Sequence, residues 1–449
     1  MRRQVALTPC PLSHAAGEGR AEAGSPPSLA GKGDGGLGKR GERGFILVEA
    51  LVVIAGLVAL MAILAANQRA SLEDIQSRLR RRRAEAAVQS ALARAVAVLQ
   101  TANPNLVTLH DDWALLGDNG NQEFDLGDAT FRLQIVDAGS LININQATAQ
   151  QLSLLPITQE MIDCLLDWRE TSLQPRPDGA KDDYYLNLQE PYHVKLGRLT
   201  TVSELLLIKN WTAKALYAPL SDSVSSAPLP EDAEGNPLPL ASLITVDNGA
   251  PNTRANGQPR LNLGQRGVSP AALIRLGLTP NIAAQIVSRA PYPSFSALLS
   301  QPGLNGQTIR LLLDNVTVTN GNRVTGKLNL NTASQAVLQT VPNVTPDIAA
   351  NIVSRQASGF NALSDLTTVP GVSGALLGQI ANVAAIGSDT WIVRAYGESG
   401  GVGVAVEAEV TLSNGEVQIK TWDRVNTAGP PAWWDWQEEP TSTIDAGAG

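Results

Sequence analysis

The chain has 449 residues, of which 43% are hydrophobic and 17% charged, so it is long enough for two or three folded domains and is not disordered throughout. Its formal net charge of −8 argues against general nucleic-acid binding, although a local basic face would still be compatible with it. The two cysteines, Cys10 and Cys164, are too few for a cysteine-based metal site, and Cys164 is expected to be a small buried residue on a helix.

Residues 45–66 form an apolar run that is long enough for one helical crossing of a bilayer. The run follows Arg43-Gly44, begins with Phe45 and contains a single charge, Glu49. A carboxylate inside lipid is costly unless it is paired, so Glu49 is expected to be functional. The order basic residue, Gly, Phe and then Glu resembles the processing site of type IV prepilins and pseudopilins.

This resemblance implies that a membrane prepilin peptidase cuts between Gly44 and Phe45 and methylates the new amine of Phe45. Glu49 would then pair with the amine of a neighbouring subunit during filament assembly. Residues 1–44 would be the leader peptide and residues 45–66 the transmembrane half of the N-terminal helix. An ordinary signal anchor is the alternative interpretation of the same segment.

Helical character continues to about Gln100, because no Gly or Pro interrupts residues 57–99 and apolar residues recur at helical spacing. Residues 123–136 alternate apolar and polar side chains and predict strands. Further strands are predicted at 391–396, 402–412 and 417–422, the last two joined by the turn-forming pair Asn414-Gly415.

A sheet built from strands before residue 140 and after residue 390 makes the material between them an insertion. The predicted fold is therefore α+β: a long N-terminal transmembrane helix packs on a small antiparallel sheet, as in type IV pilins, and carries an inserted all-α domain. The predicted segments are the periplasmic half of the helix with the first strands (67–140), the inserted helical repeats (141–385), the C-terminal strands (386–425) and a disordered Pro-rich tail (426–449).

The insertion repeats itself, which predicts stacked supersecondary units. Three units begin with Leu-Asn segments at 141–145, 261–263 and 328–331, and two pairs of helical segments follow each of them. The third unit, Leu-Asn-Leu-Asn-Thr-Ala followed by a Pro turn and Ile-Ala-x-x-Ile-x-x-Arg, resembles a helix-hairpin-helix motif.

Helix-hairpin-helix motifs can bind DNA phosphates through hairpin amides near cations. Residues 141–220 hold nine acidic against seven basic side chains, whereas residues 260–316 hold five Arg and one Asp. Most of the insertion is thus better suited to protein contacts, and no nucleic-acid partner is expected. A membrane-anchored DNA-binding protein of a competence or type IV pilus system, using Arg266, Arg275 and Arg289, is the alternative.

A second group of motifs lies at 166–220, namely Leu166-Asp167-Trp168-Arg169-Glu170, Pro175, Gly179-Ala180, Tyr184-Tyr185, Pro191-Tyr192 and Val202-x-Glu204-Leu205-Leu206. Together these motifs resemble the minor pseudopilin K family of type II secretion. The resemblance implies a single-pass inner-membrane protein with most of its chain in the periplasm. It would join the minor pseudopilins I and J at the tip of the pseudopilus, start its assembly, and contact other pseudopilins, the prepilin peptidase and the inner-membrane secretion platform.

The same family is linked to bound calcium, which implies Asp167, Glu170, Asp178, Asp182 and Asp183 as candidate ligands. Thr171, Ser172 and Lys181 stand where further acidic residues are expected, so a solvated acidic loop is the alternative and no cofactor is certain. An enzyme is not expected, because the three histidines (His14, His110 and His193) form no spaced cluster and no phosphate-binding loop or nucleophile elbow is present.

Overall fold

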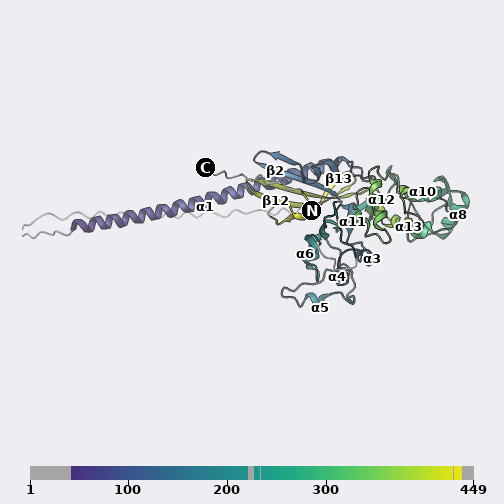
Figure 1. Ribbon diagram of the computed structural model, residues 1–449, viewed down its shortest axis with the longest axis horizontal. Coiled ribbons are helices and arrows are strands. Elements are labelled where there is room, and N and C mark those ends of the chain that lie inside the picture. Colours follow the sequence, from purple (N-terminus) through teal and green to yellow (C-terminus); the bar gives the residue numbers. More distant parts are fainter. Residues whose placement is uncertain (1–41, 221–226, 233, 428, 437–449) are drawn as a thin grey trace, which may run out of the picture. The chain divides into compact units, whose positions relative to one another are not determined.

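The computed structural model describes residues 42–220, 227–232, 234–427 and 429–436 (Figure 1). The predicted leader up to residue 41 and the end of the predicted tail, 437–449, lie outside the described residues. The chain divides into two compact units, with the division between Ser71 and Leu72. Helix α1 (Glu42–Leu99) begins in the first unit and ends in the second.

The second unit contains a five-stranded antiparallel sheet in the order β1-β2-β11-β12-β13. Its outer strand β13 lies beside β12 (Figure 1). Asn414 (φ 54°) and Gly415 (φ 79°) form the predicted turn between β12 and β13, since both adopt the positive φ that this two-residue hairpin needs. The strands are β1 (Glu123–Leu126), β2 (Ala129–Asp137), β11 (Thr390–Ser399), β12 (Val402–Ser413) and β13 (Glu416–Val425).

The C-terminal part of α1 packs on one face of this sheet through small side chains. Ala87, Ala91 and Ala95 are fully buried there, which lets the helix backbone approach the strands closely. At Gly397 of β11 a side chain would overlap the carbonyl oxygen of Ala84, so the closest approach requires glycine. The sheet contributes large apolar side chains to this core, among them Leu133, Ile135, Trp391, Val393, Val406 and Val410.

The predicted inserted helices lie between β2 and β11, which are neighbours in the sheet although far apart in sequence. The predicted α+β fold class is therefore confirmed: an apolar N-terminal helix, an antiparallel sheet and an inserted set of helical repeats. Two short elements, α2 (Asp112–Leu115) and η1 (Asp118–Gly120), lie between α1 and the sheet, and η2 (Ala138–Ser140) connects β2 to the first repeat.

Each of the three predicted repeats starts with a two-residue strand, continues through two helical hairpins, and closes with a second short strand that pairs in parallel with the first. The first repeat consists of β3 (Ile142–Asn143), α3 (Ala149–Leu152), α4 (Gln159–Arg169), α5 (Asp182–Tyr185), η3 (Val202–Leu207), α6 (Ala213–Tyr217), η4 (Leu240–Ser242) and β4 (Ile244–Thr245).

The middle repeat is set into an antiparallel stem formed by β5 (Gly249–Pro251) and β8 (Arg323–Thr325). It consists of β6 (Leu261–Asn262), α7 (Pro270–Arg275), α8 (Pro280–Arg289), α9 (Phe295–Leu299), α10 (Gly306–Asn315) and β7 (Val316–Thr317). The third repeat consists of β9 (Leu328–Asn329), α11 (Gln335–Leu338), α12 (Pro346–Gln356), η5 (Leu363–Thr368), α13 (Gly374–Val383) and β10 (Ala384–Ala385).

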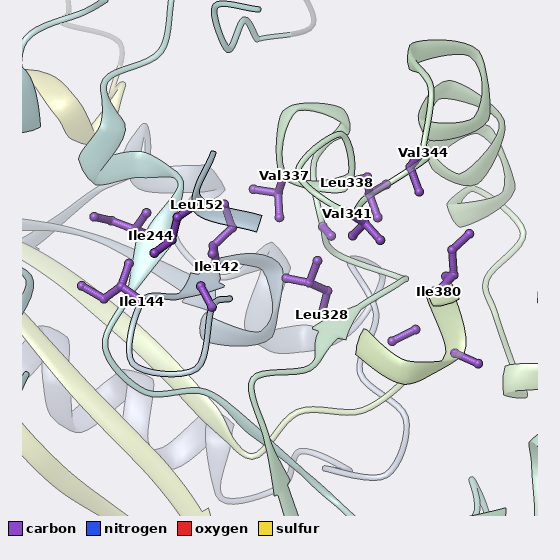
Figure 2. Packing of buried hydrophobic residues seen from close by; sticks show 14 of the residues in the cluster. Ile142, Ile144, Leu152, Ile244, Leu328, Val337, Leu338, Val341, Val344 and Ile380 are labelled. Atoms are coloured by element: carbon purple, nitrogen blue, oxygen red, sulfur yellow. The ribbon is translucent and has the colours of Figure 1, made fainter. Parts of the chain in front are cut away.

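One hydrophobic core runs through all three repeats. Figure 2 shows Ile142 and Ile244 of the β3–β4 pair beside Leu328 and Val337 of the third repeat. Since no single repeat is large enough to bury its own apolar face, the repeats depend on one another for stability.

A buried carboxylate links the sheet to the third repeat. Asp137, at the end of β2, accepts hydrogen bonds from the amide of Gly139 (2.8 Å), the side-chain amide of Asn329 (2.8 Å) and the hydroxyl of Thr332 (2.6 Å). Burial raises the pKa of Asp137 above its usual value, and these hydrogen bonds act in the opposite direction. Asn329 also donates to the carbonyl of Val107, so a single contact joins three segments of the chain.

The prediction of a disordered tail is wrong for residues 429–436. Trp434, in η6 (Ala432–Trp434), is 1% exposed and packs with Tyr396 and Ala405 on the sheet face opposite α1. The indole of Trp436 donates to Gln134 (3.2 Å) and lies 5.0 Å from the guanidinium of Arg132. A composition rich in Pro and acidic residues suggested disorder, but burial of these tryptophans opposes the entropy cost of ordering the segment.

Replacing Asp137 with Ala should destabilise the second unit by roughly 2–3 kcal/mol, because the buried donors of Asn329 and Thr332 lose their acceptor. The free energy of unfolding should be measured by urea titration with tryptophan fluorescence. Asp128→Ala is the matched control, because this carboxylate is 72% exposed and its loss should cost less than about 1 kcal/mol. Equal losses in the two variants would contradict the proposed role of Asp137.

Candidate functional site

The predicted processing and assembly residues Gly44, Phe45 and Glu49 all lie in the first two turns of α1, and the side chain of Glu49 is exposed. Within the described residues, α1 is the one helix that is long and apolar enough to cross a membrane, with a mean hydropathy of 2.8 over its most apolar window. An exposed carboxylate on such a helix has the accessibility that pairing with a neighbouring subunit would need. Cleavage after Gly44, methylation of Phe45 and the pairing of Glu49 stay predictions.

The repeats share a strand-end motif that the Leu-Asn pattern signalled only in part. Asn143, Asn262 and Asn329 each accept a hydrogen bond from the amide two residues further on, which turns the chain from the strand into the helical region. In the first and third repeats, that second residue is also an asparagine. Asn145 bonds the backbone of Leu199, and Asn331 bonds Phe360 in the same way, so each ties the start of its repeat to the second hairpin.

Most of the helical hairpins turn at a residue with positive φ, which is either glycine or asparagine. The first and third repeats have no glycine between their first two helices, but in the third repeat Asn343 (φ 66°) adopts the left-handed conformation that Gly277 (φ 104°) adopts in the middle repeat. In the second hairpins, Asn210 (φ 68°) takes the position of Gly303 and Gly371. Asparagine tolerates positive φ better than other non-glycine residues, so it can take the place of glycine in these turns.

The motif residues around 168–204 form a buried aromatic cluster. Trp168 lies edge-to-face against Tyr185 (5.3 Å between ring centroids) and against Tyr192 (6.3 Å). The indole of Trp168 donates to Glu204 (2.9 Å), which also pairs with Lys195 (2.7 Å). These contacts fix the second hairpin of the repeat on α4, so the motif carries a structural role here.

Arg169, the neighbour of Trp168, binds the backbone at the start of the first repeat. Its guanidinium donates to the backbone carbonyls of Ile144 and Ala147. In the third repeat Gln356 bonds the corresponding carbonyls of Leu330 and Ala333, both at 2.8 Å. In the third repeat it is thus Gln356, the residue after Arg355, that makes the contacts of Arg169.

Two of the five candidate calcium ligands, Asp167 and Glu170, form ion pairs with an arginine side chain. Asp167 is fully buried and pairs with the guanidinium of Arg176 (2.9 Å), which also binds both carboxylate oxygens of Glu170 (2.7 and 2.8 Å). The ammonium of Lys181 donates to the backbone carbonyls of Asp167 and Glu170. Burial lowers the pKa of Lys181, and the neighbouring carboxylates act against that shift.

The other three candidates lie apart from this pair. Asp182 contacts the imidazole of His193 (2.8 Å) and accepts from the amide of Val194, and these hydrogen bonds lower its pKa. Asp178 and Asp183 have exposed side chains. No group of three or more His, Cys, Asp or Glu side chains converges as a metal site among the residues that the structure describes.

These residues do not fit calcium, which takes six to eight oxygen ligands. Arg176 and Lys181 supply the positive charge that the carboxylates of Asp167 and Glu170 require, and their donors occupy the oxygens that would face an ion. Sequence reasoning missed Arg176 as a partner. Its position nine residues after Asp167, beyond a helix end, gave no periodic signal.

Comparison with known proteins agrees with this arrangement. Residues 141–228, which span most of the first repeat, match the family described as "Type II secretion system (T2SS), protein K". Residues 324–384, which contain the third repeat, match the helix-hairpin-helix motif, whereas the middle repeat lies in neither matched segment.

A solved structure is also similar to this chain. It is the GspK–GspI–GspJ complex of the type 2 secretion system from enterotoxigenic Escherichia coli, matched with 13% sequence identity and a TM-score of 0.40. The match covers 80% of this chain and 100% of the other. No curated protein sequence matches.

Replacing Arg176 with Ala should destabilise the first repeat by roughly 2–4 kcal/mol, because Asp167 would stay buried without its guanidinium. Thermal unfolding of the full-length chain in detergent should also be unchanged by millimolar calcium or by EDTA. Arg198→Ala is the control, since its guanidinium is 56% exposed and 3.8 Å from its carboxylate partner. A calcium-dependent rise in the unfolding temperature of the unmodified chain would contradict the role given to Arg176.

Proposed function

We propose that this protein is a non-enzymatic minor pseudopilin of a type II secretion system, anchored in the inner membrane by one helix with most of its chain in the periplasm. The observation that carries the proposal is topological. The segment that matches protein K is inserted between β2 and β11, two neighbouring strands of a sheet that packs on the helix bearing the prepilin-like junction.

Within the secretion system, the proposed place of this pseudopilin is the tip of the periplasmic pseudopilus, in a complex with the minor pseudopilins I and J that starts filament assembly. The size of the insertion supports this role. Filament subunits stack through their N-terminal helices and small sheets, and three repeats added to one sheet leave little room for a further subunit stacked above. By family resemblance, the prepilin peptidase and the inner-membrane secretion platform would also contact this chain.

A second function, DNA binding by a membrane-anchored helix-hairpin-helix protein, is favoured by the middle repeat alone. Arg266, Arg275 and Arg289 have exposed side chains there, and glycines occupy the turns of both hairpins at Gly277 and Gly303. The first and third repeats oppose it, because they carry no comparable excess of basic side chains.

One experiment separates the two functions. The tagged full-length chain, coexpressed with pseudopilins I and J of the same organism and extracted in mild detergent, should retain both partners through affinity purification and gel filtration. The variant Arg266→Gln/Arg275→Gln/Arg289→Gln should retain them equally well, since the proposed contacts do not use these side chains.

DNA binding is measured on the same two preparations, the unmodified chain and the triple variant. Neither should bind a fluorescent duplex at 150 mM salt, and an unrelated tagged single-pass membrane protein serves as the background control. Absence of pseudopilins I and J, together with salt-sensitive DNA binding that the triple variant loses, would overturn the pseudopilin proposal in favour of DNA binding.

A further inference from the structure

A polar pocket of about 330 Å³ lies where the middle repeat meets the third repeat. Its lining includes Arg254, Arg260 and Asp314, together with apolar contacts from Leu363 and Ile386. Arg254 precedes the middle repeat, Asp314 lies near the end of α10, and Leu363 begins η5 of the third repeat. A second, smaller cavity of about 40 Å³ shares Arg260 and is lined by Lys327.

The Nε of Arg254 is buried and donates to no acceptor in the part of the chain that the structure describes. A buried donor without a partner is costly and rare in folded proteins. The pocket therefore presents a cation whose donors are available to a ligand.

Arg260 is held in place by the protein and adds a second positive charge. Its Nε donates to the carbonyl of Thr253 (2.8 Å), and one Nη donates to the carbonyls of Leu313 (3.1 Å) and Val316 (3.4 Å). These acceptors are neutral and fix the guanidinium. Burial lowers the pKa of Arg260, the charge of Asp314 raises it, and the charge of Arg254 lowers it further.

The surroundings contain too little negative charge to balance these cations. Lys327, whose ammonium donates to the carbonyl of Asn382, has its pKa lowered to about 8 by burial and by the charge of Arg260. Asp314 lines the pocket, but it accepts the amide of Ser364 (2.8 Å) and forms no ion pair within the described residues. The larger pocket is thus lined by two cations, Arg254 and Arg260, and one carboxylate, Asp314.

We propose that this pocket binds an oxyanion, a phosphate or carboxylate group, on the guanidinium of Arg254 with Arg260 as the fixed second cation. The planar fork of an arginine matches the paired oxygens of either group, and a desolvated site strengthens that contact. The proposal does not depend on the pseudopilin assignment. The pocket also uses none of the exposed arginines, Arg266, Arg275 and Arg289, that DNA binding would require.

The test is thermal unfolding of the full-length chain in detergent with sodium phosphate, sodium acetate or sodium chloride at equal ionic strength. A ligand at several times its dissociation constant should raise the unfolding temperature by about 2–4 °C. Comparing phosphate with acetate identifies the oxyanion. A higher unfolding temperature with phosphate alone indicates a phosphate site, and a higher unfolding temperature with both salts indicates that carboxylates bind as well.

Arg254→Gln should abolish the rise, and Arg254→Lys should keep part of it because the charge remains. Arg266→Gln is the matched control, as this exposed arginine of the same repeat lies outside the pocket lining and should keep the full rise. No rise above chloride in the unmodified chain, or the same rise in Arg254→Gln, would overturn the proposal. Since these comparisons use the shift within each variant, lower intrinsic stability of Arg254→Gln does not mask the result.

Discussion

The pairing of β2 with β11 is the constraint on which the rest of this structure depends. Trp391 lies opposite Asp137 across the two strands, so the whole set of repeats must leave and re-enter the sheet at adjacent points. Closing so long a connection is costly in chain entropy, and the contacts at that junction oppose the cost. Asp137 holds Asn329 of the third repeat, and Arg323 of the β5–β8 stem pairs with Asp389 (2.7 Å) just before β11 begins.

The repeats show how one backbone plan can carry different surfaces. The asparagine at the end of the first strand, the parallel closing strands and the positive-φ residue of the second hairpin occur in all three units. The middle unit differs in charge, and a pocket beside it is lined by two arginines and one carboxylate, Asp314. A shared core with divergent surfaces suits a domain whose task is contact with other molecules, because contacts can change while packing is kept.

Much of this fold could be predicted from local sequence patterns. The uninterrupted helix, the alternating strands, the Asn414-Gly415 turn and the three Leu-Asn repeats all have periodic or short-range signals. What could not be predicted depends on contacts between distant residues. The pairing of Arg176 with Asp167, the burial of Trp434 on the sheet and the use of Asn343 in place of glycine each follow from tertiary neighbours that no local pattern records.

The most direct test of the account is the mass of the N-terminal peptide from membranes of cells that hold the native prepilin peptidase. The account predicts a peptide that begins at methylated Phe45, because Gly44 and Glu49 match the junction that this peptidase recognises. A peptide that continues unbroken through Gly44, in cells where a control pilin is processed normally, would contradict the assignment to the pilin pathway. The inserted repeats would then need an explanation independent of a pseudopilus.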